Sequence, residues 1–251
     1  MHEIDMQEVT QEFADCWQAA GRHLQSQVQD GISWMNASLS SPFLDHLSFR
    51  LGNQLFFVRL EPTDSSMLVP GSREGLLSIA EGCNGHPCIM QMNQRGISWA
   101  PVSSGWGLVN LISGMAVDPV ALVSHENVEM TDWELHDFSV QVVRDHIMNN
   151  GGKLISSQGN PSVDPSIWFE KDEGPEWVVV RAVRYPASRA AAVDTLALIA
   201  ENCAHFSKIG NFASVAVANA ADAFDSSKAS PMPLWRGHGM NVSFSGIERV
   251  T

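Results

Sequence analysis

An internal repeat divides this chain of 251 residues into two similar halves. Three short segments recur in the same order along the chain: Leu76–Cys83 in Leu196–Cys203, Phe57–Arg59 in Val179–Arg181, and Gly105–Gly107 in Gly237–Gly239. The first pair shares five of eight residues, and the three offsets are 120, 122 and 132 residues. Because the matches are collinear, we expect a tandem duplication with domains at residues 1–125 and 126–251.

Each half has the hydrophobic pattern of a helix, three strands, a second helix and two further strands. Apolar residues at three- and four-residue steps predict the first helix, from Val9 in one half and from the capping box Thr131–Glu134 in the other. The expected strands are Ile32–Ala37, Leu47–Leu51, Gln54–Leu60, Cys88–Met92 and Trp106–Ile112, then Lys153–Ser157, Ser166–Lys171, Glu176–Arg184, Phe212–Ala218 and Met240–Phe244. The second helices are expected at Glu74–Cys83 and Ala190–Cys203. The pattern therefore predicts an α+β fold with mostly antiparallel sheets, packed as a pseudo-dimer within the chain.

Charge and composition exclude several classes of partner. The formal net charge is −13 and both halves are acidic, whereas proteins that bind nucleic acid or anionic membranes cluster Lys and Arg. No apolar run approaches the ~18 residues of a membrane span. Four cysteines are too few for a disulfide scaffold of this length. We therefore expect a cytoplasmic protein with no nucleic-acid or membrane partner.

The sequence contains no complete catalytic, metal or cofactor motif. Cys83, His86 and Cys88 lie close together, but their spacing is not that of a zinc site and no second pair accompanies them. Gly105-Trp106-Gly107 lacks the third glycine of a dinucleotide fingerprint. No serine stands in a nucleophile elbow and no histidine is singled out as a base. We therefore predict no catalytic residue, no metal ligand and no cofactor, and a non-enzymatic role is favoured.

One alternative is a metal-dependent nuclease. The order helix, three strands, helix is similar to the core of the restriction-endonuclease-like superfamily, in which an acid on the second strand and an acid-x-Lys on the third hold a divalent metal. The resemblance implies a metal near Asp164, Glu170 or Glu176. Val178 stands where the motif requires lysine, so such a nuclease would be degenerate.

The full element order resembles a second family better. Residues Val9–Ile112 and Thr131–Phe244 each resemble a class I type III secretion chaperone or a YbjN-like protein, small acidic α+β domains of order helix, three strands, helix, two strands. In the second half, Ile199–Cys203 leads into the strand Phe212–Ala218. The resemblance implies paired domains that bind other proteins without catalysis.

Aromatic residues in loops supply candidate binding anchors. Trp99, Trp106 and Trp235 lie in or beside predicted loops, and Arg236 and His238 follow the last of them. Trp and Arg are enriched at binding hot spots, although the same tryptophans could instead cap the ends of sheets. The leading hypothesis is a chaperone-like or adaptor protein that holds a protein or peptide partner. A third possibility is a small-molecule binder in a cleft between the halves.

Overall fold

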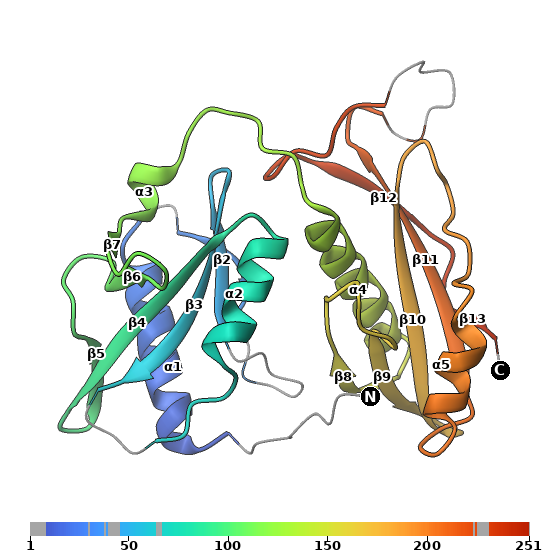
Figure 1. Ribbon diagram of the computed structural model, residues 1–251, viewed down its shortest axis with the longest axis horizontal. Coiled ribbons are helices and arrows are strands. Elements are labelled where there is room, and N and C mark those ends of the chain that lie inside the picture. Colours follow the sequence, from blue (N-terminus) through green and yellow to red (C-terminus); the bar gives the residue numbers. More distant parts are fainter. Residues whose placement is uncertain are drawn as a thin grey trace. The chain divides into compact units, whose positions relative to one another are not determined.

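The computed structural model describes residues 9–29, 31–37, 39, 46–63, 67–222, 224 and 231–250. The chain forms two compact units that divide between Asn127 and Val128. They are called here the N-terminal unit and the C-terminal unit, and each has its own sheet (Figure 1). Each unit also has its own hydrophobic core.

The N-terminal unit contains a seven-stranded sheet and three helices within its described residues. Its elements in chain order are α1 (Gln11–Gln25), β1 (Ser33–Asn36), β2 (Leu47–Leu51), β3 (Gln54–Pro62), α2 (Arg73–Gly82), β4 (His86–Arg95), β5 (Ser98–Pro101), β6 (Leu108–Asn110), β7 (Ala116–Val117) and α3 (Pro119–Leu122). A two-residue loop joins β2 to β3, and its first residue, Gly52, has φ of 56°, which glycine adopts without a Cβ clash.

The C-terminal unit contains a six-stranded sheet and two helices within its described residues. Its elements are α4 (Asp132–Asn149), β8 (Lys153–Ser157), β9 (Ile167–Lys171), β10 (Gly174–Arg184), α5 (Leu196–Cys203), β11 (Gly210–Asn219), β12 (Met240–Phe244) and β13 (Glu248–Arg249). The helix α4 begins with the predicted capping box, in which the Thr131 side chain accepts from the Glu134 amide and Glu134 accepts from the Thr131 amide.

The two sheets share one topology. The strand order is β1-β2-β3-β4 in the first and β8-β9-β10-β11 in the second, with further strands beyond β4 and β11. All pairs are antiparallel except β3 with β4 and β10 with β11, which are joined by crossovers through α2 and α5. The predicted α+β class with mostly antiparallel sheets is confirmed, and the shared topology supports the proposed duplication.

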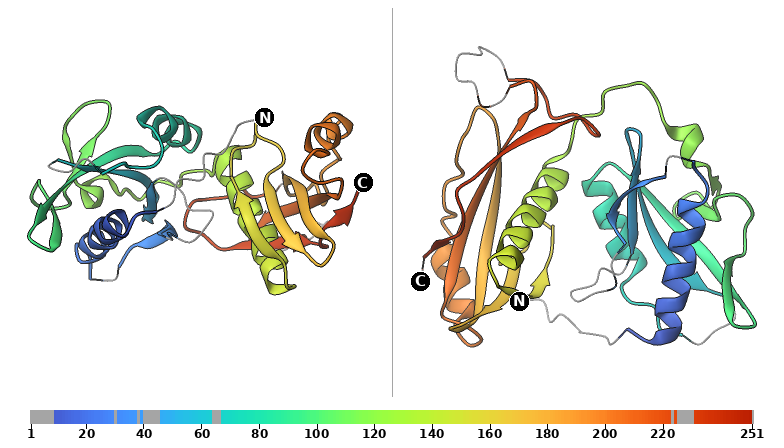
Figure 2. Two further views of the ribbon diagram at one scale, coloured as in Figure 1. Left: turned by 90° about the horizontal axis from the view of Figure 1, so that it is seen from below. Right: turned by 180° about the vertical axis from the view of Figure 1, so that it is seen from behind.

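A helix covers each face of each sheet (Figure 2). In the N-terminal unit, Phe13, Trp17 and Leu24 of α1 pack against the aromatic and Met-rich face of the sheet. In the C-terminal unit, α4 packs against the face carrying Val178 and Val180, and α5 packs against the opposite face. Burial of these faces supplies the main driving force for folding.

The elements near the end of each unit differ from those predicted from the sequence. The strands β5, β7 and β13 and the helix α3 were not predicted, and the strand expected over Trp106–Ile112 is only Leu108–Asn110. The two glycine motifs are not equivalent in register. Leu108 pairs with Met90, four residues into β4, whereas Met240 pairs with Asn219, nine residues into β11.

Candidate functional site

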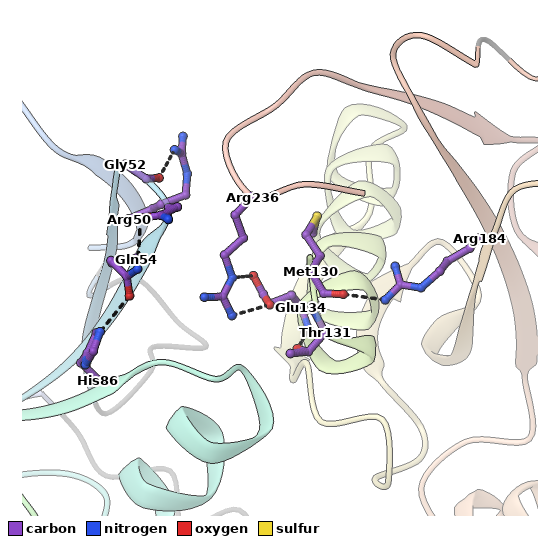
Figure 3. Close-up of polar contacts among 10 residues, drawn as sticks. Arg50, Gly52, Gln54, His86, Met130, Thr131, Glu134, Arg184 and Arg236 are labelled. Atoms are coloured by element: carbon purple, nitrogen blue, oxygen red, sulfur yellow. Dashed lines mark hydrogen bonds and ion pairs between the residues drawn. The ribbon is translucent and has the colours of Figure 1, made fainter. Parts of the chain in front are cut away.

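The candidate site lies in the C-terminal unit and is built around a buried ion pair. Arg236 donates from Nε to Glu134 Oε1 and from Nη2 to Glu134 Oε2, both at 2.8 Å (Figure 3). The two side chains are only 2% and 5% exposed. Glu134 Oε2 also accepts from the Thr131 amide at 2.8 Å. The bidentate geometry and the additional amide donor offset the desolvation of both charges.

The ion pair fixes the segment that precedes β12. The Arg236 amide donates to the Val128 carbonyl at 2.9 Å, and the Met130 amide donates to the Leu234 carbonyl at 2.8 Å. Between these two bonds, Glu129 and Trp235 form an isolated antiparallel bridge. The residues before α4 and the residues before β12 are therefore held together by main-chain bonds and by one charged pair.

The predicted anchors divide into buried and accessible residues. Trp99 and Trp106 are each 8% exposed and belong to the core under α1, and the Trp106 ring stacks on Phe49 at 6.2 Å. They are core residues, and the expectation that they act as surface anchors is wrong. Arg236 is also buried, because its charge pairs with Glu134. Trp235 is half-buried and His238 is exposed, so these two stay accessible for binding.

An open sheet edge follows directly after these residues. The strand β12 ends the path β12-β11-β10-β9-β8, so only one side of it is paired among the described strands. Val217 faces β10, because its carbonyl accepts from the Tyr185 amide at 2.9 Å. Val242 lies opposite Val217, and its own N–H and C=O must therefore point away from β11. Met240 and Phe244 share this orientation, because main-chain direction alternates along a strand.

The β12 edge lacks the features that normally protect sheet edges. Its sequence, Met240-Asn241-Val242-Ser243-Phe244, has no charge and no proline, and all five residues pair regularly with β11. Val242 is 40% exposed. The opposite edge strand, β8, has an irregular register between Leu154 and Ser156 and an exposed Lys153. Natural sheets use such bulges and lysines to prevent unwanted pairing, so β12 is the less protected edge.

A small pocket lies beside the same end of β11. Its volume is about 170 Å³, and it is lined by Glu129, Arg184, Tyr185, Val217, Ala218, Pro231, Met232, Pro233 and Leu234. Arg184 Nη2 donates to the Met130 carbonyl at 2.7 Å (Figure 3). It also donates to Asp132 at 3.0 Å. Arg184 Nη1 is buried and has no hydrogen-bond partner among the described residues.

A buried histidine lies in the same unit. His136 of α4 is 4% exposed, and its Nε2 atom has no partner within the described part of the chain. Desolvation lowers the pKa of His136 to about 4, and the positive charge of Arg181 adds to this shift while Asp164 opposes it. His136 is therefore neutral at pH 7.

The carboxylates named for a nuclease do not form a metal site. Asp164 accepts from Arg181 Nη1 at 2.9 Å and pairs with Nη2 as well, so its charge is already neutralised. Glu176 accepts from Asn211 at 2.9 Å. Arg181 and Glu176 are five residues apart on β10, or about 17 Å along an extended strand. No group of three His, Cys, Asp or Glu able to hold a metal occurs among the described residues.

The surroundings of His86 and of the four cysteines indicate structural roles for these residues. His86 contacts Gln54 at 3.0 Å (Figure 3). The His86 ring also stacks on the ring of Phe56. All four cysteines are buried, and none of them forms a disulfide. Burial raises the pKa of the Cys16 and Cys88 thiols to about 12 and that of the Cys203 thiol to about 11. Thiolates are the nucleophilic and metal-binding form, so these environments disfavour both roles.

Comparison with known proteins gives one match. Residues 133–250 match the model of a domain of unknown function (DUF8840), which covers most of the C-terminal unit, including α4 and β12, and none of the N-terminal unit. No curated protein and no solved structure matches the chain. Among the described residues, no helix is long and apolar enough to cross a membrane.

Sequence reasoning missed most of this site. It identified Thr131 and Glu134 as a capping box, but it placed Arg236 on the surface instead of against Glu134, from which it is 102 residues distant in the chain. It found the β12 strand with the observed bounds, Met240–Phe244. That β12 is an open edge follows only from the sheet order, which no local pattern encodes.

Proposed function

We propose that this protein is a non-catalytic protein- or peptide-binding protein that adds an extended segment of its partner to the β12 edge. The observation that carries the proposal is the uncharged, regularly paired edge strand with the main-chain groups of Met240, Val242 and Phe244 directed outward. An extended peptide satisfies such groups by forming a further strand, and its affinity comes mainly from main-chain hydrogen bonds.

The rigid surroundings of the edge support this function. The Glu134–Arg236 pair and the Glu129–Trp235 bridge fix the segment that leads into β12, so less conformational entropy is lost on binding. Half-buried Trp235 and exposed His238 lie only a few residues before the strand and are the remaining candidate side-chain contacts. The element order expected from the sequence resembles that of secretion chaperones, and this resemblance also favours a holding or adaptor role.

We place this activity in a reducing compartment, most simply the cytoplasm. None of the four cysteines forms a disulfide in the structure, and each is buried. Disulfides form and persist mainly in oxidising environments.

A pair of substitutions at Val242 tests strand addition. Val242→Pro removes an N–H that points outward and leaves the ladder to β11 intact, whereas Val242→Thr keeps the N–H and the β-branched shape. Peptides selected from a displayed library of random nonapeptides on the wild-type protein are measured against both variants by fluorescence anisotropy. We expect Val242→Pro to weaken binding by about tenfold, equivalent to one hydrogen bond, and Val242→Thr to bind like wild type.

Circular dichroism and the melting temperature of both variants provide the folding control. The proposal fails if the selected peptides bind the proline and threonine variants equally well. It fails also if the wild-type protein selects no peptide.

A further inference from the structure

The pocket beside β11 adds a second recognition element to the edge strand. Six of its nine lining residues are apolar: Val217, Ala218, Pro231, Met232, Pro233 and Leu234. At about 170 Å³ it is smaller than the ~300–1,000 Å³ of ordinary ligand pockets. Its size and walls fit a single apolar side chain better than a whole cofactor or metabolite.

The pocket and the edge share one strand. Val217 and Ala218 line the pocket, and they pair across the ladder with Val242 and Asn241 of β12. The Asn219 side chain donates to the Pro233 carbonyl at 2.8 Å and so attaches the pocket wall to the end of β11. A strand added beside β12 lies two strand spacings, about 10 Å, from β11, so one partner segment can contact both features.

The charge available at the pocket is negative. Asp132 and the Met130 carbonyl already engage Arg184 through Nη2, and Nη1 is not exposed to solvent. Glu129 is exposed, and its carboxylate has no hydrogen bond or ion pair within the described part of the chain. The net charge of the chain is −13. A cationic partner is therefore attracted to this site, and an anionic one is repelled.

From these observations we infer that the pocket receives one apolar side chain of the partner segment, and that Glu129 pairs with a Lys or Arg beside that side chain. The inference rests on the proposed function and names its partner class: an extended, apolar and basic peptide segment. The apolar side chain provides burial, and the basic residue provides charge complementarity.

Two short peptides of opposite charge test the partner chemistry. The probes are fluorescein-labelled Lys-Val-Leu-Val-Lys and Glu-Val-Leu-Val-Glu, each amidated at the C-terminus and measured by anisotropy at low salt. We expect the basic probe to bind at least tenfold more tightly than the acidic one, and we expect its affinity to fall as salt screens the charges. Equal binding of the two probes, tighter binding of the acidic probe, or no saturable binding of the basic probe up to millimolar concentration overturns the inference.

Variants at the pocket test its location. Glu129→Gln removes the free carboxylate, and Met232→Ala shortens an apolar wall whose residue is 46% exposed. Each substitution is expected to lower the affinity for the basic probe by about three- to tenfold. Glu201→Gln removes an exposed carboxylate of α5 outside the pocket and serves as the matched control, with unchanged affinity expected. Because all three residues are exposed, the fold should tolerate these changes.

The Val242 variants distinguish failure of this inference from failure of the proposed function. If Val242→Pro weakens binding of the basic probe while Glu129→Gln and Met232→Ala do not, strand addition stands and the pocket inference is overturned. If the pocket variants weaken binding of the probe and Val242→Pro does not, strand addition is overturned, and with it the extended form of the partner segment, while the pocket remains a contact for the peptide.

Discussion

At the third position of its first helix, the N-terminal unit has an apolar residue and the C-terminal unit has a charged one. Each helix begins after a threonine cap: Thr10 accepts from the Phe13 amide at 3.1 Å, and Thr131 accepts from the Glu134 amide at 3.2 Å. Phe13 is 1% exposed and packs on Trp17 within an apolar core, whereas Glu134 is 6% exposed and pairs with Arg236. One topology thus accommodates a buried ring and a buried ion pair at the same helical position.

The cores around these two positions also differ, both in their aromatic content and in their buried polar atoms. Fully buried aromatic rings dominate the N-terminal unit, whereas the central strands of the C-terminal unit carry mainly valine and alanine. Four of the buried polar atoms that lack a partner among the described residues belong to the C-terminal unit: Trp133 Nε1, His136 Nε2, Trp177 Nε1 and Arg184 Nη1. Because a buried polar atom without a partner lowers stability, these groups weaken the C-terminal unit more than the N-terminal unit within the described residues.

The largest expected effect comes from breaking the buried pair. Glu134→Ala leaves the Arg236 charge buried without a partner, and we expect the C-terminal unit to lose about 3–5 kcal/mol of unfolding free energy. Hydrogen–deuterium exchange across a urea titration locates the loss. The double variant Glu134→Leu with Arg236→Leu should recover most of it, because no charge remains buried.

Phe13→Ala is the matched variant in the N-terminal unit. It leaves a cavity in an apolar core, with an expected loss of about 3–5 kcal/mol and, unlike Glu134→Ala, no recovery by a second substitution at a charged residue. If Glu134→Ala leaves exchange in the C-terminal unit unchanged, or if the double leucine variant recovers none of the loss, the buried ion pair does not have the energetic role assigned to it and the comparison fails.

The next effect is a dependence of stability on pH that is specific to the C-terminal unit. The pKa of His136 is about 4 in the folded state, against 6.5 for an ordinary histidine side chain, so the unfolded state binds more protons between these limits. Stability contributed by neutral His136 is complete above pH 6.5 and is lost as pH falls toward 4. The expected slope is about 1.4 kcal/mol per pH unit, and the total reaches about 3 kcal/mol.

Urea unfolding of the wild type and of His136→Met at pH 7, 6, 5 and 4 measures this contribution. The difference between the two proteins isolates the histidine from the carboxylates that titrate at the lower end of the range. Parallel pH profiles for the two proteins would contradict the assignment.

The smallest expected effect on stability comes from the threonine N-caps, which begin α1 and α4 in the two units. Thr10→Ala and Thr131→Ala each remove one acceptor for a helix amide, and each should cost about 1 kcal/mol in its own unit. Thermal melting combined with local hydrogen exchange measures both. Losses that differ by more than about twofold would show that the caps, too, have diverged.

Local patterns predicted much of the fold and little of the site. The bounds of β2, β8 and β12 follow from alternation and turn residues, and the bounds of α4 follow from its capping box and the glycines after it. The sequence places Trp99 and Trp106 in or beside loops and so leaves open whether they bind a partner or cap a sheet. Trp99 lies in the four-residue strand β5 and Trp106 precedes the three-residue strand β6, and such short runs are too short for alternation to show which face is buried.

Long-range pairing explains the rest. The partner of Arg236 lies 102 residues earlier in the chain, and periodicity carries no information about such contacts. The exposure of β12 depends on which strand ends the sheet, and its outward groups depend on register with β11. Register and strand order arise from packing of the whole unit, so they became visible only in the structure.

Amide hydrogen exchange of β12, measured by nuclear magnetic resonance with and without the basic peptide, tests the central claim most directly. In the free protein, the Val242 amide should exchange rapidly, while the amides of Asn241 and Ser243, which face β11, should exchange slowly. Saturating peptide should slow exchange at Val242. A Val242 amide that is already protected in the free protein, or one that still exchanges rapidly when the peptide is bound, would contradict strand addition at this edge.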